Sequence, residues 1–362
     1  MTRRLVRTLI GGCCRASGVL STAERRNRRR LTILCYHRVL PADRKAAYFC
    51  PDLVVTPESF RLHCRTLARY FTILPLSEAV DMWRKWSEPQ RPIAVVTFDD
   101  GYRDNYENAA PVLDETGLRA TFFVIAGLVD TTTSTWYDRL AWSLGSLRRQ
   151  GRLKEMLGQP AMAELLGCSL DDRADLDGIR RRLIVTAKAL DVEKRRALLE
   201  QLETAAGPRQ ADASEDSIMT WRQLAELADA GHEIGSHSQT HEILTQLNDA
   251  SLESEVTGSR ELLEKRLGRC VRAFCYPNGN ADERVTHAVD TAGYACAVTV
   301  TPGSNEPTQN LLGLKRWFIH EDRLCGPLGK ASATLLRMEL CGLADRVFCR
   351  RQVQAEIGSM PV

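Results

Sequence analysis

Two adjacent carboxylates stand at the end of an apolar run. Residues 93–100 read IAVVTFDD, so Asp99 and Asp100 close the run just before Gly101. Such a run predicts a buried strand of a parallel sheet, and ligands of α/β folds bind at the carboxyl ends of these strands. Buried carboxylates are costly unless they are paired or bind a metal. The pair alone leaves a second interpretation open, in which both aspartates cap the next helix.

Two histidines follow another predicted strand. His237 and His241 are four positions apart, at and after the end of HEIGSH, residues 232–237. If the segment is helical, this spacing places both imidazoles on one face, where they can bind one divalent cation. The alternative is a helix cap formed by Ser236 or Ser238, with an incidental pair of histidines.

The two motifs together are more specific than either alone. Two imidazoles and one carboxylate make a ligand set with open positions, which is typical of catalytic rather than structural zinc sites. The second carboxylate remains available as a base. A metal in such a site polarises a carbonyl and acidifies a bound water, so the combination predicts a metal-dependent hydrolase.

These motifs, in this order, resemble those of the NodB-homology polysaccharide deacetylases, also called carbohydrate esterase family 4. The resemblance covers about residues 31–320, except for a helical insertion, and it is of the exopolysaccharide-associated type. The matching segments are TFDDGYRDNY (97–106), ATFFVIAG (120–127), GHEIGSHSQTHEIL (231–244), FCYPNG (274–279) and the similar YHRV (36–39). It implies an enzyme that removes N-acetyl groups from amino sugars of a polysaccharide or a glycan precursor.

The resemblance also implies roles for individual residues. Asp100, His237 and His241 would be the metal ligands, and Asp99 would be the general base on a metal-bound water. Zinc is the expected cofactor, with cobalt, nickel or manganese as alternatives. A backbone N–H near Asn278 could hold the oxyanion.

Four residues are expected to bind substrate: His37, Tyr102, Tyr276 and Asn278. Tyr102 is expected to line the pocket. His37 ends the first predicted strand, and it could contact substrate or only form a hydrogen bond at the mouth of the barrel.

The chain departs from the family pattern in two places. Many members carry an arginine that steadies the catalytic aspartate, and this sequence has Cys275 at that position. Arg316, near the end of a later strand, could substitute, whereas Arg272 is less suited because it begins its strand. The late motif that supplies the general acid is best matched by His320, for which a purely structural role is the alternative.

The elements around these motifs alternate between strand and helix. This alternation implies a parallel sheet or barrel, and the resemblance implies a distorted (β/α) barrel of about seven parallel strands. Residues 128–218 carry no strand signal and predict a helical insertion that caps the active-site mouth. The strands are expected at residues 31–39, 93–100, 119–127, 232–237, 271–277, 294–300 and 314–319.

The expected organisation has three parts. Residues 1–30 are a basic, flexible arm, residues 31–325 are the deacetylase domain with its insertion, and residues 326–362 are a helical tail. The arm is either simply solvated or touches anionic lipid or an acidic polymer. A net charge of only +3 argues against a dedicated nucleic-acid binder.

The composition also bears on location. Arginines interrupt the apolar residues near the N-terminus, and no run of 18 apolar residues exists, so neither a signal peptide nor a membrane span is expected. The expected location is cytoplasmic or peripheral to a membrane. The 12 cysteines form no CxxC pair and fit buried free thiols better than a disulfide framework.

Two other functions compete with deacetylation of a glycan. The same site could hydrolyse a non-sugar amide or an ester. Alternatively, the chain could be a non-catalytic glycan-binding member of the fold, which Cys275 favours. Retention of the three metal ligands and of Asp99 argues against this last interpretation.

Overall fold

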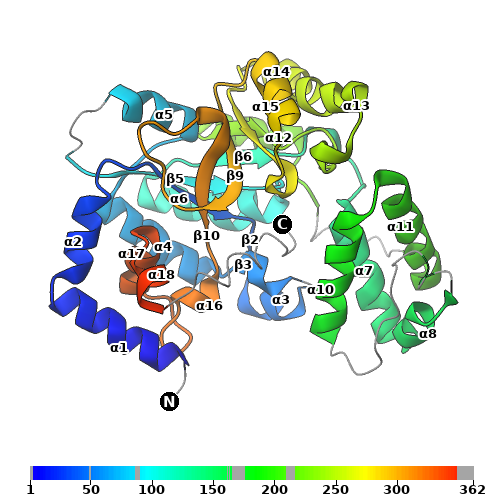
Figure 1. The fold of residues 1–362 in the computed structure, drawn as a ribbon, viewed down its shortest axis with the longest axis horizontal. Coiled ribbons are helices and arrows are strands. Elements are labelled where there is room, and N and C mark those ends of the chain that lie inside the picture. The colour runs from blue at the N-terminus through cyan, green and yellow to red at the C-terminus, as the bar shows by residue number, and fades with distance from the viewer. Residues whose placement is uncertain are drawn as a thin grey trace.

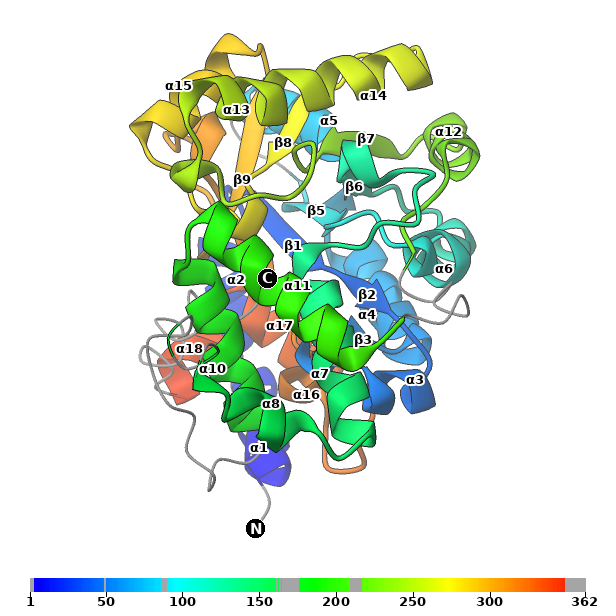
Figure 2. The ribbon, with the colours of Figure 1, turned by 90° about the vertical axis from the view of Figure 1, so that its right-hand side faces the viewer.

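Seven parallel strands form a closed barrel. The computed structural model describes residues 3–48, 50–85, 90–160, 162, 164, 176–208 and 217–348. The strands pair in the order β1-β10-β9-β8-β7-β6-β5, and β5 returns to β1 (Figures 1 and 2). They are β1 (Thr32–Tyr36), β5 (Ile93–Phe98), β6 (Thr121–Val124), β7 (Glu233–Ser236), β8 (Ala273–Cys275), β9 (Cys296–Pro302) and β10 (Leu314–Phe318). All seven expected strands are present, so the predicted barrel is confirmed.

Three short strands complete the sheets. The strand β4 (Thr72–Ile73) pairs with the beginning of β5. The strands β2 (Arg38–Val39) and β3 (Val54–Val55) pair with each other outside the barrel.

The pairing register brings strand ends to one level. Every residue of β1 and β5 is buried, because side chains cover both faces of the barrel wall. Tyr36 lies opposite Phe98, and Cys35 lies opposite both Thr97 of β5 and Phe318 of β10. The residues that follow these strands therefore emerge at the same end of the barrel.

Helices follow most strands and surround the barrel (Figure 1). Thr56 caps α4 by accepting a hydrogen bond from the backbone of Ser59. Thr220 and Gln223 form a capping box at the start of α12. These outer helices are α4 (Pro57–Tyr70), α5 (Leu76–Lys85), α6 (Ala110–Thr116), α12 (Trp221–Asp229), α13 (Asp249–Glu253), α14 (Ser259–Leu267) and α15 (Glu283–Thr291).

The long connection between β6 and β7 is helical where it is described. Its helices gather on one side of the barrel (Figures 1 and 2, green). They are α7 (Trp136–Arg149), α8 (Leu153–Leu157), α10 (Leu176–Ala189) and α11 (Val192–Ala206). Residues 165–175 and 209–216 of the predicted insertion lie outside the described residues.

The N-terminal segment differs from the expected flexible arm. It forms α1 (Arg3–Ala16) and α2 (Val19–Arg26), which lie against α17 (Ala333–Leu340) and α18 (Leu343–Phe348) near the other end of the chain. Arg337 forms two 2.7 Å hydrogen bonds with Glu24, and Leu20 is buried. These tertiary contacts order helices that would be marginal in isolation.

Two sequence-based expectations can be compared directly with the fold. The ten described cysteines are all free thiols, while Cys168 and Cys349 lie outside the described residues. Within the described part of the chain, no helix has the length and apolar character that crossing a membrane requires.

The β7 wall of the barrel leaves no room for a side chain at Gly235. A Cβ there would lie 2.6 Å from Cδ1 of Phe123 and 3.0 Å from the carbonyl oxygen of Ala273. We expect Gly235→Ala to lower the free energy of unfolding by about 1–3 kcal/mol, because neighbouring strands must move apart. Gly258→Ala is the matched control, since only Ser254 Oγ comes near, at 3.9 Å. Equal urea midpoints for the two variants would contradict this expectation.

Candidate active site

The two adjacent aspartates reach one site because the backbone turns sharply after β5. Asp100 and Gly101 both have positive φ angles, of 71° and 76°. The backbone N–H of Asp99 donates to the Tyr36 carbonyl at 3.0 Å, which holds this turn beside the end of β1. Left-handed backbone is unfavourable for most residues but tolerated by aspartate.

The segment from His237 to His241 is not helical, so the assumed helical face is wrong. Ser238 and His241 have φ angles of 63° each, which folds the segment into a tight loop. Ser236 Oγ accepts from the Ser238 N–H at 3.2 Å, and Ser238 Oγ accepts from the His241 N–H at 3.0 Å. The loop still brings the two imidazole rings to 4.7 Å centroid separation.

Three donor atoms of this region converge on one point. Asp100 Oδ1 lies 3.5 Å from His237 Nε2 and 3.6 Å from His241 Nε2. All three side chains are buried, and none of these three atoms has a hydrogen-bond partner among the described residues. Ligands held about 2.1 Å from one tetrahedral ion have separations of this size, so the three residues fit a divalent cation.

The protonation of the two imidazoles suits metal binding. Burial lowers the pKa of both His237 and His241, which favours neutral rings with a free lone pair. His237 Nδ1 lies 2.8 Å from the Cys275 carbonyl oxygen, to which it donates, and this leaves Nε2 as the ligand atom. Burial, reinforced by the charge of Asp99, raises the pKa of Asp100, which a bound cation would offset.

Asp99 is held by a buried arginine. Arg316 donates two hydrogen bonds to it, from Nη1 to Oδ1 and from Nη2 to Oδ2, each 2.7 Å long. The Arg316 guanidinium also donates to the Thr299 carbonyl at 2.9 Å and to Thr97 Oγ1 at 3.2 Å. Burial alone would raise the pKa of Asp99, but the charge and hydrogen bonds of Arg316 hold it well below its usual range.

Cys275 stands beside this pair. Its Sγ lies 3.3 Å from Arg316 Nη2 and 3.5 Å from Asp99 Oδ2. The guanidinium that many relatives place at position 275 is thus supplied here by β10, two strands away in the barrel order.

Two other groups of candidate ligands include Asp99: Cys35 with His37, and His237 with Cys275. Both would use a carboxylate that Arg316 already holds. Burial raises the pKa of each thiol, which disfavours the thiolate that a metal needs. The Asp100 group therefore fits a cation best.

His37 and His320 occupy different positions around Phe318. His37 Nε2 lies 3.9 Å from Asp99 Oδ2, and burial lowers the pKa of this imidazole to about 4. His320 precedes α16 (Glu321–Leu324), and its ring lies 4.4 Å from that of Phe318, which in turn lies 5.1 Å from His37. The structure therefore brings His37 close to Asp99, while the ring contact described for His320 is with Phe318.

The two tyrosines expected to bind substrate are committed elsewhere. Tyr102 is fully buried, and its hydroxyl donates to Asp138 Oδ2 at 2.9 Å. Tyr276 is also buried, and its hydroxyl donates to the Leu312 carbonyl at 2.9 Å. Both hydroxyls are hydrogen-bonded to the protein, and substrate binding by these two tyrosines stays a prediction.

Asn278 meets a residue that the sequence motifs did not reveal. Lys188, near the end of α10, donates from Nζ to Asn278 Oδ1, and its charge also acts on His37 and His241. Burial lowers the pKa of Lys188 to about 7. A lysine on an amphipathic helix gives no local signal for this placement, because it depends on how the insertion folds over the barrel.

A buried arginine fixes the insertion to the loop that carries His241. Arg195 of α11 donates to the Leu190 carbonyl at 3.2 Å and to Gln246 Oε1 at 3.1 Å, and it pairs with Glu242. The Tyr137 ring of α7 lies 5.1 Å from the His241 ring. The expected cap is thus in direct contact with the candidate metal centre.

The sequence of this chain matches a known family. Residues 87–166 and 191–297 match the family model described as Polysaccharide deacetylase. The chain therefore belongs to the polysaccharide deacetylase family, as its motifs indicated. Enzymes of this class hydrolyse the amide bonds of N-acetyl groups.

Individual relatives agree with this assignment. YxkH of Bacillus subtilis (strain 168), named as a polysaccharide deacetylase, is 23% identical over 289 residues, which cover 79% of this chain and 70% of YxkH. The Streptococcus pyogenes deacetylase PplD, solved in complex with acetate, superimposes with a TM-score of 0.53 at 20% identity, covering 83% of this chain and 96% of PplD. IcaB from Ammonifex degensii superimposes with a TM-score of 0.50 at 19% identity, and the match covers 81% of this chain and 93% of IcaB. These two structures share the barrel fold.

The Asp99–Arg316 pair should dominate local stability. We expect Arg316→Met to lower the free energy of unfolding by about 3–5 kcal/mol, because it leaves a buried carboxylate unpaired. Arg272→Met is the matched control, since Arg272 forms an exposed fork with Asp81 and should cost less than about 1 kcal/mol. Urea unfolding measures both, and equal losses would contradict a neutralising role for Arg316.

Proposed function

We propose that this chain is a divalent-metal-dependent deacetylase that removes N-acetyl groups from amino sugars of a polysaccharide or of a glycan precursor. The convergence of Asp100 Oδ1, His237 Nε2 and His241 Nε2 beside a second carboxylate carries this proposal. Family membership supports the reaction class, and the glycan is inferred from that membership.

Asp100, His237 and His241 would hold the cation. Zinc suits two imidazoles and one carboxylate, and cobalt, nickel and manganese are alternatives. A cation bound there supplies Lewis acidity toward the acyl carbonyl and lowers the pKa of water. The His237 hydrogen bond to the Cys275 carbonyl would keep that ring oriented toward the ion.

Asp99 would act as the general base. It neighbours the ligand set in sequence, and Arg316 keeps its carboxylate ionised and fixed in one orientation. As the base, Asp99 would accept the proton of the attacking water at a carboxylate oxygen. A backbone N–H near Asn278 would donate to the acyl oxygen when it becomes negatively charged.

The departing amine needs a proton, and Lys188 is better placed to give it than His320. Lys188 Nζ donates to Asn278, and its charge acts on His37 and His241, so this ammonium group is near residues of the candidate site. A pKa of about 7 suits donation near neutral pH. His320 packs against Phe318, and it remains the alternative donor or a residue with a structural role.

The non-catalytic interpretation loses its main support. It rested on Cys275 in place of the usual arginine, whereas Arg316 occupies that position around Asp99. Hydrolysis of a non-sugar amide or ester at the same site remains as the alternative, and substrate comparison distinguishes it.

Acetate release from N-acetylated oligosaccharides tests the metal dependence. We expect a chelator to abolish release and added zinc or cobalt to restore it. Asp99→Asn should keep the bound metal, measured by elemental analysis, but lose about 10²-fold or more in kcat. His241→Ala should lose metal and activity together, and exposed His287→Ala is the control for both. Full activity of Asp99→Asn would exclude it as the base, and glycan binding without any acetate release would contradict the enzyme.

Lys188→Met should lower kcat by about 10²-fold with little change in KM. The donor acts when protonated, so its contribution exists below a pH of about 7 and is lost above it. Cys50 acts on this ammonium group, and the ammonium group in turn acts on His37 and His241.

The pH profile of kcat therefore should lose its basic limb in Lys188→Met but not in Lys194→Met, which changes an exposed lysine. If His320→Ala removes the limb and Lys188→Met does not, His320 is the donor instead.

A further inference from the structure

Exposed apolar side chains gather around the N-terminal helix. Five large apolar residues are exposed in the described part of the chain: Val6 (36%), Leu9 (53%), Val19 (46%), Val185 (44%) and Leu328 (86%). Val6, Leu9 and Val19 lie on α1 and at the start of α2. Leu328 lies in a turn beside α1, because a Cβ at Gly326 would be 3.5 Å from Thr8 Oγ1 and one at Gly329 would be 3.6 Å from Arg4 Nη1. Leu328 therefore lies beside Arg4 and Thr8, apart from the other three, and we call Val6, Leu9 and Val19 the N-terminal apolar patch.

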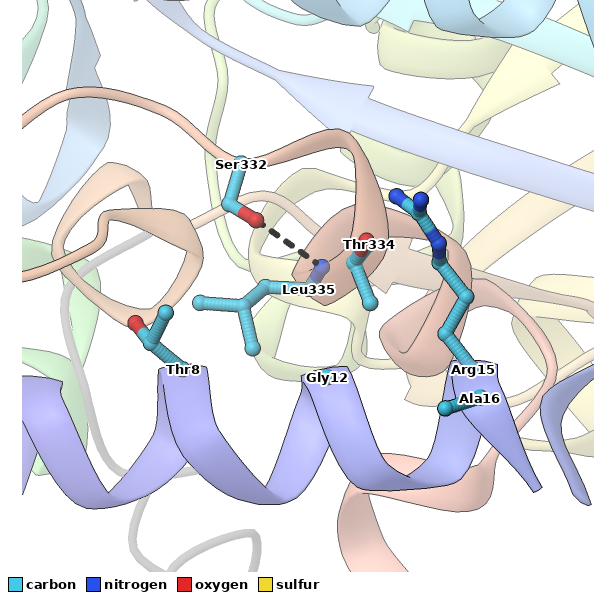
Figure 3. A pocket seen from close by; sticks show the side chains of 7 residues that line it. All are labelled: Thr8, Gly12, Arg15, Ala16, Ser332, Thr334 and Leu335. Atoms are coloured by element: carbon cyan, nitrogen blue, oxygen red, sulfur yellow. Dashed lines mark hydrogen bonds between the residues drawn. The ribbon is translucent and has the colours of Figure 1, made fainter.

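The helix α1 turns its polar residues toward the protein. Arg4 pairs with Asp322 at 2.9 Å, and the Arg7 guanidinium lies over the Phe348 ring. Thr8 and Arg15 line a cavity of about 370 Å³ between α1 and the start of α17 (Figure 3). Gly11 is the buried contact point, since a Cβ there would be 3.4 Å from Leu335.

The opposite face of α1 is apolar and exposed. Val6, Leu9 and Cys13 follow one another at spacings of three and four, which puts them on one face of the helix. A surface helix of a soluble protein normally turns its apolar stripe toward the core. This helix in addition leaves Val6, Leu9 and Cys13 exposed, so its outward face suits contact with an apolar environment.

Charge around the patch is strongly one-sided. Residues 1–30 contain nine arginines and one glutamate, a net +8, whereas the whole chain has a net +3 and the remainder is therefore −5. Within this segment Glu24 pairs with Arg337, Arg4 pairs with Asp322 and Arg30 pairs with Glu306, so the excess of arginine persists. Arginines next to an exposed apolar helix face are the pattern of helices that lie in the interface of an anionic membrane.

We propose that α1 and α2 dock the protein on a membrane that contains anionic phospholipid. The N-terminal apolar patch would enter the boundary between headgroups and acyl chains, and exposed arginines such as Arg3 on α1 and Arg25 and Arg26 on α2 would contact lipid phosphates. A second copy of the chain fits less well, because two such surfaces would bring +8 against +8. An acidic polymer would leave Val6 and Leu9 without a role.

Sedimentation of the full chain with vesicles tests this proposal. We expect binding to phosphatidylcholine vesicles that contain phosphatidylglycerol, little binding to phosphatidylcholine alone, and weakening by salt. Leu9→Asp should weaken vesicle binding by about tenfold or more, because it puts a charge into the apolar boundary. Val185→Asp is the matched control: it changes the exposed apolar residue on α10, away from the patch, and should bind like the unmodified protein.

Unfolding curves and acetate release from a soluble oligosaccharide should be the same for Leu9→Asp and the unmodified chain, so docking and catalysis are tested separately. Vesicle binding that Leu9→Asp leaves unchanged would overturn the proposal. The proposal would also be overturned if the protein bound no vesicles but formed a dimer that Leu9→Asp converts to monomer. It would equally be overturned if the protein bound only a soluble polyanion.

Discussion

The ion pair between Asp99 and Arg316 is the interaction on which the candidate site depends. Removing two charges from water costs several kcal/mol for each ion, and only excellent geometry with further hydrogen bonds repays that cost. Arg316 meets this condition through its fork on Asp99 and its bonds to Thr97 and Thr299. These residues stand on or just after β5, β9 and β10, so the pair can form only when the barrel is closed.

Much of this arrangement could be predicted from the sequence because its signals are local. Several barrel strands, such as β5 and β6, are apolar runs bounded by turn residues, and Asp99 and His237 directly follow β5 and β7. Arg316 could be named as a substitute for the missing arginine because it lies near the end of a predicted strand of the same parallel barrel. Strand ends in such a barrel share one rim, which makes even a distant residue a reasonable candidate.

What could not be predicted depends on φ angles and on contacts between distant segments. The spacing of His237 and His241 suits a helix, but positive φ at Ser238 and His241 produces a loop with the same convergence. The sequence predicts that Tyr102 lines the pocket, whereas in the structure its hydroxyl donates a hydrogen bond to Asp138 of the insertion. The helices α1 and α2 are held in place partly by the bond from Arg337 to Glu24, two residues that are more than 300 positions apart.

The order in which the strands close the barrel determines which residues a shortened chain must retain in order to fold and function. The stretch that matches the family model runs from residue 87 to 297, yet β1, β10, His37 and Arg316 all lie outside it. A fragment cut at those limits would also lose most of β9, would expose the open edges of β5 and β8, and would leave Asp99 without its counter-ion. The boundaries by which such a chain is recognised are therefore narrower than those within which it can fold and work, and a shortened version must begin before Leu31 and extend beyond Phe318.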